Sequence, residues 1–114
     1  MSELRFVVLY RWRLHPGSEA AFVQAWSRVS ELLRSQRGSL GSRLHRGDDG
    51  LWYSYAQWPS AVARQEAFAA GHVDAEATAQ MERAIAERYP ETVLECVADF
   101  LVPIDHSGTL LSVP

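Results

Sequence analysis

The chain has 114 residues, of which 47% are hydrophobic and 22% are charged, which predicts one soluble globular domain with a single core. The net charge of −3, with no run of basic residues, argues against a nucleic-acid partner. Charged residues interrupt the apolar N-terminal stretch, so neither a secretory signal nor a membrane span is indicated, and we expect a cytoplasmic protein.

Residues 5–14 alternate between apolar and mixed positions, which predicts a β-strand with one buried face. A Pro-Gly pair ends this strand. Ser18 is placed to cap a following helix, with Glu19 near the positive end of the helix dipole. Apolar residues then recur at spacings of three and four, which predicts an amphipathic helix ending near Gly38. They are Phe22, Ala25, Trp26, Val29, Leu32 and Leu33.

The next two segments predict a β-hairpin. "LGSRLHRG" and "LWYSYAQW" flank the turn signal Asp48-Asp49-Gly50. In the second strand, side chains alternate between the two faces, so Trp52, Ser54, Ala56 and Trp58 share one face and Tyr53, Tyr55 and Gln57 share the other.

The last third of the sequence predicts two helical regions and a strand. Ser60 can cap an alanine-rich helix anchored by Phe68, which Gly71 and His72 interrupt. Asp74 can cap a further helix that Pro90 closes and that carries Met81, Ala84, Ile85 and Tyr89. Residues 92–102 then read as a final strand, with one wholly apolar face formed by Leu94, Cys96, Ala98, Phe100 and Val102.

The order β-α-β-β-α-β predicts an α+β, ferredoxin-like sandwich with a four-stranded antiparallel sheet and helices on one side. We expect residues 1–102 to form this domain and residues 103–114 to form a tail that can pack on a dimer partner. The sheet face opposite the helices is also apolar, so it predicts a homodimer through that face. The residues concerned are Val7, Leu9, Tyr53, Tyr55, Val93, Val97 and Leu101.

Two stretches carry a resemblance to a known family. "VVLYRWRLHPGSEAAFVQAW" joins a strand ending at Pro-Gly to a long helix, and "RGSLGSRLHRGDDGLWYSYAQWPSAVARQEAFAAG" joins a Gly-Ser-x-Leu-Gly step to an aromatic strand ending in Trp-x-Ser. These features resemble the antibiotic biosynthesis monooxygenase (ABM) domain family, within the dimeric α/β-barrel superfamily, over about residues 4–102.

The resemblance is to a family whose members are of three kinds. Members include oxygenases that act on polycyclic phenols without metal or flavin, haem-degrading enzymes, and proteins with no established activity. Trp58 matches the tryptophan that lines the pocket of the haem-degrading members. Their first-strand asparagine is replaced by Tyr10, and His72, the one histidine near their helix histidine, is not clearly aligned with it, which argues against haem degradation.

The aromatic residues predict an apolar cleft between the sheet and the helices, because small residues between large ones leave volume there. The candidate substrate-binding residues are Trp12, Phe22, Trp26, Trp52, Trp58 and Phe68. His72 is the candidate proton acceptor, and Tyr10 is the candidate hydrogen-bond partner of a phenolate. The alternatives are that the aromatics are plain core and that His72 is a solvent-exposed residue at a helix end.

The sequence contains no Gly-rich phosphate loop, and its histidines lack the spacing of metal ligands, so we expect neither a metal nor a cofactor. Two classes of function stay open. One is a cofactor-independent monooxygenase-like enzyme acting on a small planar phenol or quinol. The other is a non-catalytic dimeric barrel that binds a small hydrophobic ligand or has a structural role.

Overall fold

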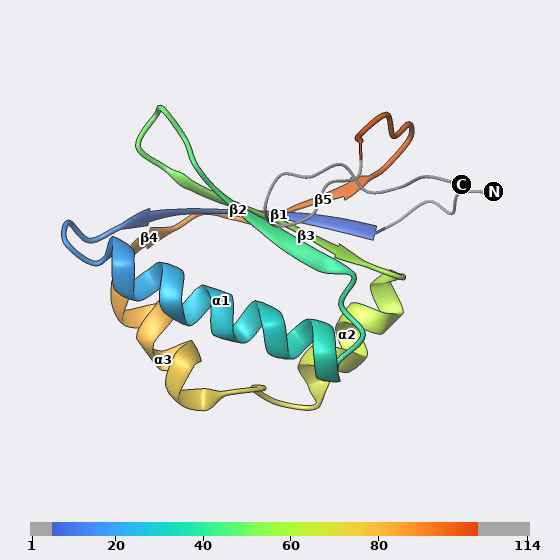
Figure 1. The fold of residues 1–114 in the computed structure, drawn as a ribbon, viewed down its shortest axis with the longest axis horizontal. Helices are drawn as coiled ribbons and strands as arrows, with labels where there is room; N and C mark the ends of the chain where they lie inside the picture. The colour runs from blue at the N-terminus through green and yellow to red at the C-terminus, as the bar shows by residue number, and fades with distance from the viewer. Residues whose placement is uncertain (1–5, 103–114) are drawn as a thin grey trace.

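A computed structural model describes residues 6–102 and has an antiparallel sheet with three helices on one of its faces (Figure 1). The elements are β1 (Phe6–Leu14), α1 (Glu19–Gln36), β2 (Gly41–Arg46), β3 (Trp52–Trp58), α2 (Ala61–Ala69), α3 (Ala75–Ala84), β4 (Ile85–Arg88) and β5 (Thr92–Glu95). The strand order is β2-β3-β1-β4, and β5 also pairs with β1. The predicted α+β, ferredoxin-like fold class is confirmed.

The central strand β1 decides which side chains face the helices. It pairs with β3 so that Tyr10 lies opposite Ser54 and Trp12 lies opposite Trp52. Because directly paired residues of antiparallel strands point to the same face, the even-numbered residues of both strands share the helix-covered side. All four such residues of β3 are buried, as predicted: Trp52, Ser54, Ala56 and Trp58.

The core forms where α1 crosses the sheet. Phe22 of α1 is 0% exposed and meets Trp12 edge to face, with 5.2 Å between ring centroids. On its other side Phe22 meets Trp52 in the same way at 6.2 Å. Edge-to-face pairs of this kind add to the stabilisation that comes from burial alone. Phe22 therefore packs α1 against both central strands.

The helix starts follow the predicted capping residues. The Ser60 side chain accepts a hydrogen bond from the Ala63 amide, at 3.1 Å, and the Asp74 side chain accepts one from the Ala77 amide, at 3.0 Å. Ser18 occupies the cap position of α1, but its side chain makes no capping hydrogen bond. The Asp74 pKa is lowered, first by the Ala77 amide and then by Arg28.

The predicted helix after Asp74 is wrong in its last turn. The helix ends at Ala84, and Ile85–Arg88 forms β4, which pairs with the end of β1. Ala86, Glu87 and Arg88 are good helix formers, so the local preference favours a helix, and pairing with the free edge of β1 overrides it.

The predicted final strand is shorter and is offset by a bulge. Arg88 pairs with Trp12, and Thr92 pairs with Leu9. Between these two pairs β1 spans three residues, whereas the segment from β4 to β5 spans four, so one residue is extra. Pro90 lies in this break, where it lacks the N–H that a regular ladder needs. After β5 reaches Phe6, the described part of β1 has no further residue to pair, and residues 96–102 have no strand assignment.

The bulge reverses the predicted faces of β5, because a one-residue slip turns every side chain over. Val93 pairs with Val8 on the helix-covered face, and Leu94 pairs with Val7 on the opposite face. Val7 was expected to be open to a partner, but it is only 1% exposed in the single chain. The predicted tail, residues 103–114, lies outside the described residues. Among residues 6–102 no helix is both long and apolar enough to cross a membrane.

We expect Phe22→Ala to lower the free energy of unfolding by about 3–5 kcal/mol, because it empties the space between α1 and two buried tryptophans. Chemical denaturation followed by circular dichroism measures this loss. The matched control is Val23→Ala, the next residue on α1, whose side chain is 38% exposed. A cost for Phe22→Ala no larger than that for Val23→Ala would contradict the assigned core.

Candidate functional site

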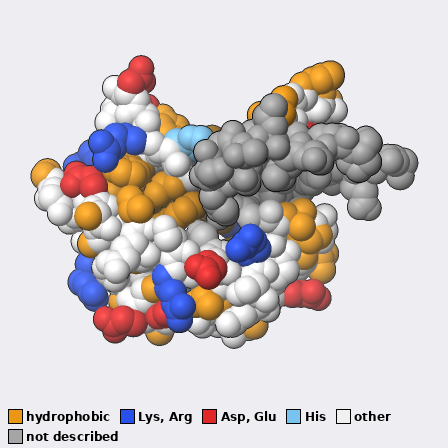
Figure 2. Space-filling model, in the orientation of Figure 1, with side chains coloured by type: hydrophobic (Ala, Val, Ile, Leu, Met, Phe, Trp, Pro, Cys, Tyr) orange, Lys and Arg blue, Asp and Glu red, His pale blue; other side chains and the backbone are white. Residues whose placement is uncertain are grey.

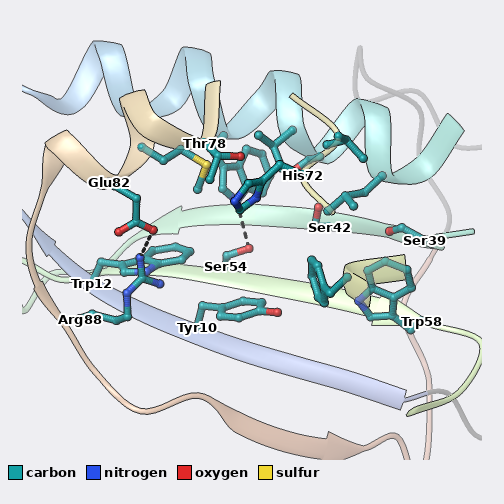
Figure 3. Close-up of a pocket in the computed structure, with 18 of the residues that line it drawn as sticks. Tyr10, Trp12, Ser39, Ser42, Ser54, Trp58, His72, Thr78, Glu82 and Arg88 are labelled. Atoms are coloured by element: carbon teal, nitrogen blue, oxygen red, sulfur yellow. Dashed lines mark hydrogen bonds and ion pairs between the residues drawn. The ribbon is translucent and has the colours of Figure 1, made fainter. Parts of the chain in front are cut away.

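A cavity of about 420 Å³ lies between the helix-covered face of the sheet and the helices (Figure 3). The apolar layer between the sheet and the first half of α1 also reaches the surface (Figure 2). The cavity is lined by Tyr10, Trp12, Trp26, Val29, Ser30, Leu33, Ser39, Ser42, Ser54, Ala56, Trp58, Phe68, Gly71, His72, Val73, Thr78, Met81, Glu82 and Arg88. Its size suits a small organic molecule.

The floor of the cavity is an aromatic surface on β1. The rings of Tyr10 and Trp12 are nearly parallel, at 3°, with centroids 5.7 Å apart. The neighbouring strand contributes Ser54 opposite Tyr10 and Ala56 two residues further on. These side chains are too small to fill the space above the floor, so the room in the cavity arises from their alternation with two tryptophans.

One hydrogen bond crosses the interior from α1 to the sheet. The Trp26 indole Nε1 donates to the Ser54 hydroxyl at 3.2 Å, and Ser54 is 2% exposed. This bond satisfies a polar group of the helix and one of the strand at the same time, which keeps the Trp26 ring in the cavity wall.

The roof is the connection between α2 and α3, which carries Gly71, His72 and Val73. His72 is exposed, and no hydrogen bond or ion pair joins it to another described residue. Arg37, just after α1, fastens this connection: its Nη1 donates to the carbonyl oxygen of Ala67 at 2.5 Å and to that of Gly71 at 2.8 Å. Arg37 therefore anchors the chain just before His72. Arg28 anchors it just after, through Asp74 at 3.1 Å.

One end of the cavity is closed by Trp58 and Phe68, whose rings meet edge to face at 5.7 Å. Trp58 is 1% exposed, and its indole Nε1 is buried without a hydrogen-bond partner among the described residues. A buried N–H without a partner is costly, and such groups are rare in native proteins. The Trp58 N–H is thus an unsatisfied donor in the core beside this end of the cavity.

Behind the same end, Arg64 links Tyr10 to Glu91. Its Nη2 donates to the Tyr10 hydroxyl at 2.9 Å and to the Glu91 carboxylate at 2.8 Å. Burial raises the pKa of Tyr10 above its ordinary value, although Arg64 acts in the opposite direction. Burial disfavours the Arg64 charge, but its bonds to Tyr10 and Glu91 outweigh that effect and raise the pKa of Arg64. At neutral pH the pair is therefore a neutral phenol beside a guanidinium.

The opposite end carries an ion pair between Glu82 of α3 and Arg88 of β4, 2.5 Å apart (Figure 3). Their side chains are 58% and 50% exposed, so the pair contributes little to stability. It gives the cavity one charged end that solvent reaches and one closed aromatic end.

Six of the eight residues suggested by the sequence line the cavity, namely Tyr10, Trp12, Trp26, Trp58, Phe68 and His72. Phe22 and Trp52 do not; they lie in the core beyond Trp12. Sequence reasoning missed Arg64, Glu82 and Arg88, because charged residues on a helix or strand usually indicate a solvated face. Among the described residues, no three His, Cys, Asp or Glu side chains are grouped to hold a metal ion.

Comparison with known proteins gives a family and a fold. The family model described as antibiotic biosynthesis monooxygenase matches residues 5–84. No curated protein matches the sequence. The match to the family model spans both central strands, α1, α2 and α3, and therefore includes nearly every residue that lines the cavity.

Solved structures of several proteins, including three from bacteria, have this fold. A candidate antibiotic biosynthesis monooxygenase from Chloroflexus aurantiacus is 16% identical, with a TM-score of 0.67 over 85% of this chain and 96% of that one. Another, from Bordetella bronchiseptica, is 19% identical, with a TM-score of 0.67 over 86% of this chain and 100% of that one. A protein from Mycobacterium tuberculosis is 19% identical, with a TM-score of 0.61 over 90% and 98% of the two chains.

We expect Arg37→Ala to loosen the roof, because it leaves the Ala67 and Gly71 carbonyl oxygens without this donor. Hydrogen-deuterium exchange of peptides covering residues 67–73 should become faster. The control is Arg34→Ala, an exposed arginine in the last turn of the same helix. Equal exchange in the two variants would show that Arg37 does not hold the roof.

Proposed function

The chain belongs to the antibiotic biosynthesis monooxygenase family, and from this premise we propose that it is a cofactor-independent monooxygenase acting on a small planar phenol, quinol or anthrone. The observation that carries the proposal is the cavity: three tryptophans and a tyrosine surround about 420 Å³ beside a histidine. Flat aromatic walls favour a flat aromatic ligand.

The proposed chemistry uses the substrate as its own reductant. Removal of a proton from an anthrone-type CH₂ group gives an electron-rich anion, which transfers electrons to dioxygen and forms a C–O bond. One oxygen atom stays as a new carbonyl group, and the other leaves as water with the two hydrogens of the CH₂ group. The protein contributes orientation, exclusion of water and a proton acceptor.

His72 is the proposed acceptor, because imidazole exchanges protons near neutral pH and this side chain lies in the roof above Ser54 (Figure 3). Tyr10 is proposed to hydrogen-bond an oxygen of the substrate from the floor. Trp12, Trp26, Trp58 and Phe68 are the proposed binding residues, and Phe22 and Trp52 support them from the core.

One observation favours the second candidate, a binding protein without catalysis. His72 is not oriented by a hydrogen bond from any described residue, whereas a general base is usually held by a second group. In that case the same cavity would bind a small hydrophobic molecule and release it unchanged.

We also propose that two copies pair through the sheet face opposite the helices. The segment after β5 lies on that side in Figure 1 and presents large apolar side chains to solvent. Val97 is 82% exposed and Phe100 is 94% exposed. Packing against another copy of the chain would bury these side chains. A second sheet of the same shape is a suitable cover for such a surface.

Trp58→Ala should weaken the binding of 1-naphthol, measured by isothermal titration calorimetry, by at least tenfold, because it removes the closed end of the cavity. Trp52→Ala is the matched control: both rings are buried on the same face of β3, but Trp52 lies outside the cavity. Both changes should cost about 3–5 kcal/mol of stability. Equal loss of binding in the two variants, or loss in neither, would mean that Trp58 is core only.

His72→Ala should retain 1-naphthol binding and lower anthrone-dependent oxygen consumption by about 10²-fold, the usual contribution of a general base. His45→Ala, an exposed histidine of β2 outside the cavity, is the control. Turnover by wild type no faster than spontaneous oxidation would favour the binding protein, and undiminished turnover by His72→Ala would remove His72 from the mechanism.

Val97→Asp should convert the homodimer to monomers, because a carboxylate would be buried in the apolar interface. Size-exclusion chromatography with light scattering measures the mass. Val62→Asp is the control, since Val62 is 60% exposed on α2, on the helix side. Val7 is unsuitable because it is buried within one chain. A wild-type monomer, or a Val97→Asp dimer, would contradict this interface.

A further inference from the structure

The hydrogen bond between Arg64 and Tyr10 has a fixed direction. A guanidinium has donors and no acceptor, so the Tyr10 oxygen must be the acceptor in the 2.9 Å bond. A tyrosine hydroxyl can accept and donate at the same time. No described residue receives the Tyr10 hydrogen, which is therefore left for another partner.

Arg64 is held in place by three side chains. Glu91, between β4 and β5, binds its Nη2 at 2.8 Å, and the guanidinium carbon lies 5.2 Å from the Phe68 ring centroid and 5.8 Å from that of Tyr10. Its side chain is 20% exposed, and it is not among the residues that line the cavity. Because Arg64 does not line the cavity, its hydrogen bonding influences a ligand there through Tyr10.

A second donor lies at the same end. In Figure 3 the Tyr10 hydroxyl points along the floor toward Trp58, and Glu82 and Arg88 lie at the other end. The Trp58 Nε1 is buried and has no partner among the described residues. The carboxylate of Glu82 is bound to Arg88. Because the Trp58 Nε1 has almost no accessible surface, the Tyr10 O–H is the donor that the closed end offers to a ligand.

We propose that Arg64 is a positioning residue: by donating to the Tyr10 oxygen it leaves the Tyr10 O–H free to donate into the cavity, where it binds the carbonyl oxygen of a planar aromatic ketone. The closed end selects a hydrogen-bond acceptor over a donor such as an ammonium group. This inference rests on the proposed function, because both use the same cavity.

The same arrangement has a consequence for the proposed reaction. When a proton leaves the CH₂ group of an anthrone, the negative charge moves onto the carbonyl oxygen across the ring. The Tyr10 O–H, already placed there, stabilises that charge without giving up its proton. Tyr10 is therefore a hydrogen-bond donor in this scheme, and the proton is accepted elsewhere.

Two probes of matched shape test the donor. 1-Tetralone carries one carbonyl oxygen and no donor, and tetralin is the same bicycle without oxygen. By calorimetry, Tyr10→Phe should weaken 1-tetralone binding about tenfold, the loss of one hydrogen bond, and change tetralin binding less than twofold. Tyr53→Phe is the control, because its hydroxyl binds Asp49 in the hairpin outside the cavity.

Arg64→Met keeps the apolar stem and removes the donor, so it should weaken 1-tetralone binding at least threefold and leave tetralin binding unchanged. Arg64→Lys should recover part of the loss. Thermal unfolding shows that each variant is folded. If the substitutions weaken the binding of both probes equally, or do not weaken the binding of 1-tetralone, the inference is wrong, but the proposal of an aromatic binding cavity is unaffected. If neither probe binds wild type, the proposed function fails with it.

The pKa of Tyr10 provides a further test. It would not change if Arg64 had a purely structural role. Burial and Glu91 raise the pKa of Tyr10, and Arg64 and Arg88 lower it. Arg64→Met should therefore shift the ionisation of Tyr10 to higher pH, and Arg64→Lys should shift it less. NMR of ring-labelled tyrosine, with Tyr10→Phe for assignment, measures this. An unmoved titration would show that Arg64 does not act on the hydroxyl.

Discussion

The pairing of β1 with β3 is the constraint on which the cavity depends. In this register Tyr10 faces Ser54 and Trp12 faces Trp52, so large and small side chains meet in a fixed order on one face. A slip by one residue would exchange the two faces and turn the floor of the cavity toward the opposite side of the sheet. The helices only cover a space that the two strands have already shaped.

Much of this architecture could be predicted from the sequence, because it follows from local periodicity. The alternation in residues 51–58 predicted the face that carries Trp58, and Ser60 and Asp74 marked two helix starts. The errors occur where pairing decides the structure. Ile85–Arg88 fits a helix or a strand, and the bulge near Pro90 is set by contact with β1, so the faces of β5 could not be predicted from alternation alone.

The aromatic residues of the candidate site, with Tyr10 and His72, were predictable, and its charged groups were not. Aromatic residues next to small ones indicate a cavity, whereas the charged groups come from distant positions. Arg64 and Glu91 meet across 27 residues of sequence, and Arg64 and Tyr10 meet across 54. Pro90 hinted at the break that carries Glu91, but no local pattern indicated that an arginine of α2 would contact the first strand.

The floor and the roof of the cavity are built by different kinds of structure, and this has an evolutionary consequence. The floor is part of the paired strands, where most substitutions would also endanger folding. The roof is the short connection around His72. Arg28 binds it through Asp74, and Arg37 binds it through two backbone carbonyl oxygens, which remain available whatever side chains the connection carries. Under the proposed function, new ligand preferences can therefore be acquired by changing the roof, while the sheet is left intact.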